Sequence, residues 1–205
     1  MSARHPAPKQ LQPTSFAFSA ANEAEIKKII AKYPAGRQAS AVMPLLDLAQ
    51  RQHDNWVPLA AIEHIATLLG MPYIRVLEVA TFYTMYNLAP VGRNFIQVCT
   101  TTPCWLRGSD QVLDACRSSL GIGPGETTKD GQFTVIEVEC LGACVNAPMA
   151  QIGDDFYEDL DTASTTKLIE ALKRGETPKA GPQSGRRSSE PLSGLTTLNA
   201  GGGGE

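Results

Sequence analysis

Four cysteines in two short stretches are the residues of this chain whose type and spacing indicate chemistry. Cys99 and Cys104 form a C-x4-C pair, and after 35 further residues Cys140 and Cys144 form a C-x3-C pair. Each pair follows a run rich in β-forming residues. Because grouped thiolates are typical ligands of zinc and of iron–sulfur clusters, we expect these four to bind metal. The remaining chain then serves as scaffold or docking surface.

The spacing of the pairs bears on which metal they bind. Paired zinc knuckles are usually C-x2-C, and neither pair has that spacing. The plant-type ferredoxin pattern, C-x4-C-x2-C with a distant fourth cysteine, also differs. Four thiolates at a looser spacing suit a [2Fe–2S] rhombus, which has two irons to ligate. The residues alone favour iron and sulfur, with zinc and a disulfide or unligated set as alternatives. A redox-active dithiol enzyme fits less well, since its C-x2-C is missing.

The elements around the cysteines predict how the two pairs meet. A strand over 95–99, a helix over 109–120 and a strand over 133–138 form a βαβ unit, whose strands should be parallel and joined right-handedly. Both cysteine loops then leave the same edge of the sheet. Pro103 predicts an extended first loop, because a residue before proline avoids the α region. Gly142 predicts a turn with positive φ in the second loop.

The other elements define an α+β fold. Helical periodicity and cap residues predict a helix capped by Asn22, a second after Ser40, a third from Pro58 to Gly70, and a fourth from Pro72 through Tyr86. Short strands over 149–152 and 155–157 precede a last helix, capped by Thr162 or Ser164 and ending at Gly175. The expected parts of the chain are an extended arm (1–18), a helical bundle (19–90), the cysteine-bearing domain (91–175) and a disordered Gly/Ser/Pro-rich tail (176–205).

Composition excludes several classes of protein. The 205 residues are 42% hydrophobic with a formal charge of −3, which gives no basic surface for nucleic acid. No apolar run reaches the roughly 20 residues that cross a bilayer, and the first residues lack the apolar core of a secretory signal. We therefore expect an intracellular protein without direct membrane insertion. In a reducing compartment, five cysteines favour ligands or catalytic thiols over disulfides.

Three motifs resemble one known family. Thr81-Phe-Tyr-Thr-Met-Tyr86, Val98-Cys99-Thr-x2-Pro-Cys104 and Glu139-Cys140-Leu-Gly-Ala-Cys144-x2-Ala-Pro-Met149 are similar to those of the thioredoxin-like [2Fe–2S] ferredoxin subunits of respiratory complex I. The resemblance covers roughly residues 15–174. It implies a thioredoxin-like α/β domain behind the helical bundle, with Cys99, Cys104, Cys140 and Cys144 ligating one [2Fe–2S] cluster.

The resemblance also implies the setting of that cluster. It would lie next to the flavin mononucleotide (FMN) of an NADH-oxidising partner subunit, within the peripheral arm of the proton-translocating NADH:ubiquinone oxidoreductase. FMN and NADH would bind the partner, and this chain would hold no complete active site and no catalytic residue. The expected location is peripheral, on the cytoplasmic side of a bacterial inner membrane. Equivalent subunits of NAD-linked formate dehydrogenases or hydrogenases, and a zinc-binding structural module, are the alternatives.

Other conspicuous residues have ordinary explanations. Cys116 shares an apolar helix face and is expected in the core. His53 and His64 are expected on the surface or in helix packing, and Glu137 and Glu139 on a solvated edge. Trp105 is expected to shield the cluster, or else to pack under its loop. The aromatic run either fills the bundle or lines a seam with the cluster domain or partner; its residues are Phe82, Tyr83, Met85 and Tyr86.

Overall fold

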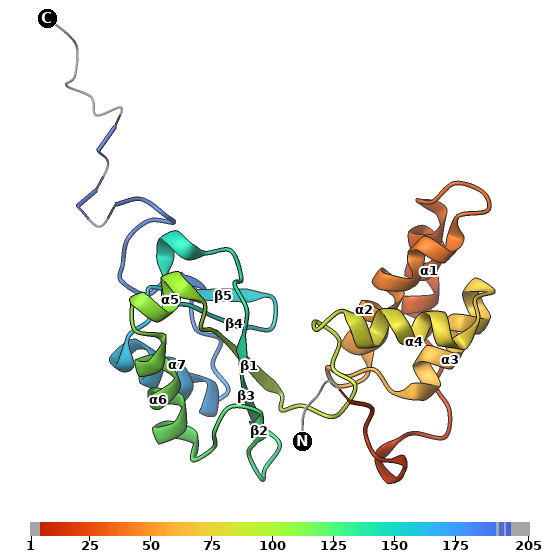
Figure 1. Ribbon diagram of the computed structural model, residues 1–205, viewed down its shortest axis with the longest axis horizontal. Coiled ribbons are helices and arrows are strands. Elements are labelled where there is room, and N and C mark those ends of the chain that lie inside the picture. Colours follow the sequence, from red (N-terminus) through yellow and green to blue (C-terminus); the bar gives the residue numbers. More distant parts are fainter. Residues whose placement is uncertain (1–4, 192, 195, 198–205) are drawn as a thin grey trace, which may run out of the picture. The chain divides into compact units, whose positions relative to one another are not determined.

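The chain forms two compact units in a computed structural model that describes residues 5–191, 193, 194, 196 and 197 (Figure 1). The first unit lies within Met1–Arg93 and the second within Asn94–Glu205. Among the described residues, the first unit contains helices and no strand, whereas the second combines helices with a sheet. The α+β fold class expected from the sequence is therefore confirmed.

The first unit is a small helical bundle with its own core. Its helices in the described residues are α1 (Ala20–Ala31), α2 (Val42–Gln52), α3 (Leu59–Leu69) and α4 (Tyr73–Phe82), with the 3-10 turns η1 (Lys9–Leu11) and η2 (Gln38–Ala41). Leu45, Leu46 and Ile62 are wholly buried between them. Gly70 ends α3 in the left-handed region, at φ 63°, as its place in the sequence predicts.

Two boundaries of this bundle differ from expectation. Ser19, not Asn22, caps α1: its hydroxyl accepts the Asn22 N–H at 3.3 Å, so the helix begins three residues earlier. The helix expected through Tyr86 ends at Phe82, and a turn follows in which the Tyr86 N–H donates to the Tyr83 carbonyl. The Tyr86 ring is then buried, and its hydroxyl donates to the Met43 carbonyl at 2.9 Å.

The arm before the bundle packs against it. Phe18 is 6% exposed, and its ring lies 5.5 Å from that of His64. Phe16 contacts both His64 and His53, and His53 lies edge-on to Trp56 at 4.7 Å. These ring contacts confirm packing roles for the two histidines.

The second unit is built on a mixed sheet. Its six strands, among the described residues, lie in the order β2-β3-β1-β4-β5-β6. The strands are β1 (Asn94–Cys99), β2 (Glu126–Thr127), β3 (Phe133–Val138), β4 (Ala150–Ile152), β5 (Asp155–Glu158) and β6 (Gly181–Pro182). The helical elements are α5 (Thr102–Leu106), α6 (Ser109–Leu120), the 3-10 turn η3 (Cys144–Asn146) and α7 (Thr162–Lys173).

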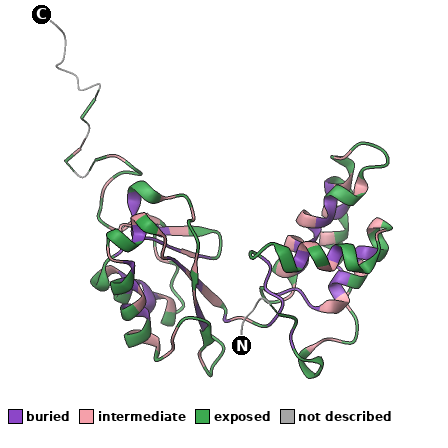
Figure 2. Cartoon of the chain, viewed as in Figure 1, coloured by how far each residue is buried: buried purple, intermediate pink, exposed green. Residues whose placement is uncertain are grey.

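The centre of this sheet is the predicted βαβ unit. β1 and β3 are parallel and α6 joins them, which confirms the topology expected from the sequence. Helices α6 and α7 contact each other and lie beside the sheet (Figure 1). Their apolar faces join the strands in one buried core (Figure 2). Val98, Val112 and Ile169 are wholly buried in it.

Two features of the second unit also differ from expectation. Asp161, rather than Thr162 or Ser164, caps α7, and Ser164 completes a reciprocal capping box at the third helical position. Part of the tail expected to be disordered, residues 181–190, makes specific contacts: β6 pairs with β5, and Arg186 forms an ion pair with Asp159. Residues 192, 195 and 198–205 of the expected tail lie outside the described residues.

The cap of α7 predicts a pH-dependent effect of one substitution. The Asp161 carboxylate accepts the Ser164 N–H at 2.7 Å, and this bond holds the pKa of Asp161 below its usual range. Asp161→Ala should lower the local stability of α7 by about 1 kcal/mol at pH 7. Because the folded pKa is depressed, the stabilisation is present above the unfolded pKa of about 3.9 and is lost as the pH falls through the folded value.

Hydrogen exchange of α7 amides at neutral and acidic pH measures this effect. The matched control is Thr162→Ala, which removes an exposed side chain that makes no cap bond. Equal protection of α7 in the two variants at pH 7 would contradict the assignment of the cap.

Candidate metal centre

The pairing of β1 with β3 places the two cysteine loops side by side. Cys99, the last residue of β1, lies opposite Val138, the last residue of β3. Cys140 follows two residues later, and the Thr100 N–H donates to the Val138 carbonyl at 3.3 Å. Both loops thus leave one edge of the sheet, as parallel strands require.

The first loop turns into a helix instead of staying extended. Thr101 caps α5 in an extended conformation, with ψ 170°, and Thr102 is already helical, so the expected extended loop is wrong. Pro103 fits because the first turn of a helix has no internal partner for its N–H groups. This turn folds Cys104 back toward Cys99, and both side chains are 2% exposed.

The second loop turns at Gly142. Its φ of 89° confirms the predicted left-handed conformation, which a residue with a Cβ rarely adopts. The turn brings the Sγ atoms of Cys140 and Cys144 to 3.4 Å, with both side chains exposed. This separation is much longer than a disulfide bond of about 2.05 Å, and both residues are free thiols.

The two loops meet in one small apolar cluster. Cys99 and Cys104 pack there with Ala147 and Met149, and Leu141 and Ala143 of the second loop contact the same cluster. The Cys99 N–H donates to the Met149 carbonyl at 3.2 Å, and α5 contacts η3. The four cysteines therefore lie as two pairs at one end of the sheet. No three His, Cys, Asp or Glu side chains of the described residues are grouped to hold a single metal ion.

Hydrogen bonds polarise the first pair of thiols. Burial opposes ionisation of Cys99, but bonds from the Thr101 hydroxyl at 3.3 Å, from the Thr101 and Leu141 amides and from Cys104 together lower its pKa. Burial raises the pKa of Cys104 to about 12, and its hydrogen bond to Cys99 acts in the same direction.

The second pair lies on the exposed side of the centre. The hydrogen bond with Cys140 raises the pKa of Cys144, and nearby Cys99 adds a repulsion between thiolates. These residues fit a [2Fe–2S] cluster, which needs two sulfur ligands for each of two irons. The Thr101 and Leu141 amides directed at Cys99 supply the N–H···S bonds that stabilise an anionic thiolate site.

Exposed apolar side chains flank the cysteine loops. Trp105 is 59% exposed, Leu106 71% and Val145 73%. Trp105 therefore does not pack under its loop. In the first unit Phe82, Tyr83 and Met85 are also exposed, and of that aromatic run Tyr86 alone fills the bundle.

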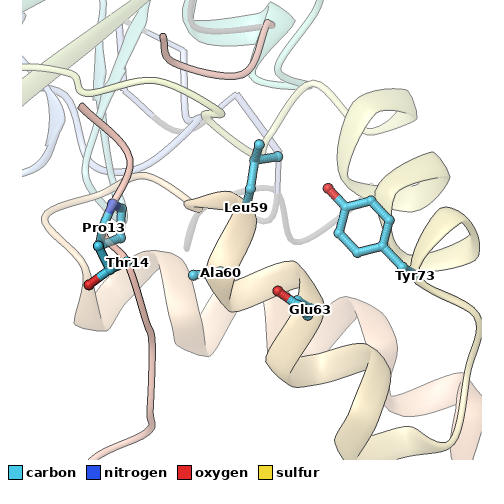
Figure 3. Close-up of a pocket in the computed structure, with 6 residues that line it drawn as sticks. All are labelled: Pro13, Thr14, Leu59, Ala60, Glu63 and Tyr73. Carbon is cyan, nitrogen blue, oxygen red and sulfur yellow. The ribbon is translucent and has the colours of Figure 1, made fainter. Parts of the chain in front are cut away.

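The remaining conspicuous residues have no part in the centre. Cys116 is 1% exposed in the core of the second unit, which confirms its expected role. Glu137 and Glu139 are exposed, as expected for a solvated edge. A hollow of about 370 Å³ in the first unit lies between the arm and helices α3 and α4 (Figure 3). Its lining contains no cysteine and comprises Pro13, Thr14, Leu59, Ala60, Glu63 and Tyr73.

Two contributors were missed by reasoning from sequence. Thr101 follows Cys99 by two residues, a spacing at which hydroxyls often bond a neighbouring group, so local pattern could have indicated it. Arg186 contacts the carbonyl of Val145, beside Cys144, from 41 residues away. No local signal predicts such a contact.

Comparison with known proteins identifies the family. Residues 26–173 match the thioredoxin-like [2Fe-2S] ferredoxin family, and the chain belongs to that family. The match confirms the resemblance, the thioredoxin-like fold and the [2Fe–2S] cofactor that the resemblance implied.

Two curated relatives are similar over most of their length. The chain is 52% identical over 185 residues to "NADH dehydrogenase [ubiquinone] flavoprotein 2, mitochondrial" of Dictyostelium discoideum, covering 90% of this chain and 75% of the relative. It is 57% identical over 160 residues to a subunit of the NADH-quinone oxidoreductase of Rickettsia bellii, covering 78% of this chain and 96% of the relative.

A solved structure shares the fold. The NAD+-reducing [NiFe]-hydrogenase in its H2-reduced state matches with a TM-score of 0.56 and 24% identity, over 66% of this chain and 23% of the hydrogenase chain. Among residues 5–197 as far as they are described, no helix combines the length and apolarity needed to span a bilayer.

The burial of the fifth cysteine predicts selective alkylation of the metal-free chain. At pH 8, iodoacetamide should modify the exposed Cys140 and Cys144 and leave Cys116 unmodified, since burial raises the pKa of Cys116 to about 11. Mass spectrometry of tryptic peptides reads this directly, because residues 108–117 form a peptide with Cys116 as its one cysteine. Modification of Cys116 as fast as Cys140 would contradict its place in the core.

Proposed function

We propose that this chain is the electron-transfer subunit of a proton-pumping NADH:quinone oxidoreductase, and that Cys99, Cys104, Cys140 and Cys144 bind its one [2Fe–2S] cluster. The observation that carries the proposal is the meeting of two thiol pairs at one edge of the sheet. The names of the relatives, at 52% and 57% identity, support the assignment to this oxidoreductase.

The chain's own residues would hold the cluster in an asymmetric setting. A [2Fe–2S] cluster supplies a site that takes up and releases one electron at a time. Cys99 and Cys104 would bind it from the buried side, where Ala147 and Met149 exclude water. Cys140 and Cys144 would bind it from the exposed side. Partial exclusion of water and N–H···S bonds are the means by which a protein adjusts the potential of such a site.

Metal binding requires all four thiols to lose their protons. The sulfurs of each pair lie within hydrogen-bond reach of each other, and loading the site with metal would release the protons that the four thiols hold. The Thr101 hydroxyl and the Thr101 and Leu141 amides would then remain as donors to Cys99. No side chain of this site is needed as an acid or base, which agrees with a role in electron transfer.

The partner we propose is the flavin-bearing, NADH-oxidising subunit, with FMN and NADH bound there and not on this chain. The sequence has no Gly-rich dinucleotide fingerprint of its own. Exposed Trp105, Leu106 and Val145 beside the cysteines offer an apolar surface for such a neighbour. Further contacts would be with other peripheral-arm subunits, at the cytoplasmic side of a bacterial inner membrane, as the Rickettsia relative suggests.

Spectroscopy of the full chain tests the cofactor. Purified anaerobically, the protein should be reddish-brown and, after reduction with dithionite, give an S = 1/2 electron paramagnetic resonance (EPR) signal. A colourless protein with one equivalent of zinc would contradict the proposal and support a structural zinc module.

Serine substitutions test the ligands. Cys99→Ser, Cys104→Ser, Cys140→Ser and Cys144→Ser should each alter or abolish the EPR signal, because each removes a thiolate from iron. Cys116→Ser is the matched control and should leave the signal unchanged, since this thiol lies in the core of the second unit. Loss of the signal in Cys116→Ser would overturn the assignment.

Co-purification tests the assembly. An N-terminally tagged chain, isolated from its own cells after mild solubilisation of membranes, should retain a flavin-containing subunit and NADH:quinone activity. Isolation with a soluble formate dehydrogenase or hydrogenase would place it in one of those enzymes instead.

A further inference from the structure

The chain beyond the family match lies against the second cysteine loop. The match ends at residue 173, yet β6 (Gly181–Pro182) pairs with β5, and the Gln183 N–H donates to the Glu158 carbonyl at 2.9 Å. From there the chain runs through Arg186 to Glu190 beside η3. We call residues 181–190 the C-terminal strap.

Arg186 is the centre of the strap's contacts. Its Nε and Nη2 donate to the two carboxylate oxygens of Asp159 at 2.6 and 2.5 Å, and Nη2 also donates to the Val145 carbonyl at 3.0 Å. Nη1 donates to the Glu190 carbonyl at 3.2 Å. One guanidinium therefore joins the strap, the end of β5 and the residue that follows Cys144.

This ion pair differs from those on the surface. The Arg186 and Asp159 side chains are 10% and 11% exposed, whereas those of Lys28 and Glu25 are 72% and 44% exposed. Exposed ion pairs contribute little to folding stability. An arginine–carboxylate pair that is joined by two hydrogen bonds and shielded from water also fixes the relative orientation of its two side chains. The Asp159 backbone lies in the left-handed region, at φ 52°. Its carboxylate also accepts the Ser184 hydroxyl at 2.7 Å.

A second contact ties the same loop to the strap. Asn146, 4% exposed, donates through Nδ2 to the Ser188 carbonyl at 3.1 Å and to Glu158. The backbone carbonyl of Asn146 accepts the Asp159 N–H at 2.8 Å. The strap thus contacts both residues after Cys144, and the end of β5 contacts Asn146 as well.

We propose that Arg186 is a positioning residue for the second cysteine pair: by joining Asp159 to the Val145 carbonyl, it fixes the loop from which Cys140 and Cys144 project. The inference rests on the proposed role of these two cysteines as ligands. The first pair needs no such device, because β1 and α5 hold it within the core.

The rate of cluster loss tests the proposal. The full-length chain is loaded anaerobically, and the visible absorption is followed in excess iron chelator. Arg186→Ala should speed the loss about tenfold, in line with other changes behind a metal ligand. The matched control is Arg187→Ala, since Arg187 is exposed on the same strap, and it should behave like the unchanged chain. Equal rates for the two variants would overturn the proposal.

Hydrogen exchange in the metal-free chain separates positioning from general destabilisation. Arg186→Ala should speed exchange of the Asn146 and Ala147 amides and leave that of Val112 in α6 unchanged. Equal acceleration at all three amides would mean a general loss of stability and would contradict the proposal.

A conservative variant covers the case in which Arg186→Ala does not fold. Arg186→Lys keeps the charge, but an ammonium cannot reproduce the planar fork on Asp159 while reaching Val145. Its rate of cluster loss should exceed that of the unchanged chain. If Arg186→Ala folds, the rate of Arg186→Lys should also stay below that of Arg186→Ala. A rate equal to that of Arg187→Ala would overturn the proposal.

Failure of the ligand assignment is distinguishable from failure of the strap. If Cys140→Ser and Cys144→Ser retain the cluster unaltered, the assignment fails, and the strap's role fails with it. If both lose it while Arg186→Ala matches Arg187→Ala, the strap's role alone is wrong.

Discussion

The parallel pairing of β1 with β3 is the constraint on which the site depends. It sets Cys99 opposite Val138 and so starts both cysteine loops at one edge of the sheet. Helix α6 lies between the two cysteine pairs in the sequence, and its apolar face packs on the same two strands. The burial that stabilises the second unit therefore also places the two thiol pairs at the same edge of the sheet.

Much of this arrangement could be predicted from sequence because it follows from periodicity and topology. The β-rich run over 133–138 and the helical stripe over 109–120 coincide with β3 and α6, and the βαβ rule gave the parallel pairing. The positive φ of Gly142 was predictable because glycine, which has no Cβ, adopts this conformation readily in a turn. The conformation of the first loop was not predictable in this way. A residue before proline tends to be extended, but proline is also well tolerated in the first turn of a helix, and at Pro103 the helix forms.

The other differences have a common physical origin in contacts between distant or competing groups. Ser19 and Asp161 cap their helices where other plausible cap residues stood nearby. Asp161 forms a reciprocal capping box with Ser164, and the Ser19 N–H donates to the distant Gln52 side chain. The composition of the strap resembles that of a disordered segment, yet β5 offered it a free edge and Asp159 a partner for Arg186. Propensity cannot register a bond between residues 27 positions apart.

The proposed centre joins two thiol pairs around one two-iron cluster. Mössbauer spectroscopy of the full chain, purified anaerobically from cells grown on 57Fe, tests this most directly. We predict two irons per chain, both in tetrahedral sulfur coordination and magnetically coupled to a diamagnetic ground state when oxidised. One isolated iron per chain, or none with zinc in its place, would contradict the proposed centre.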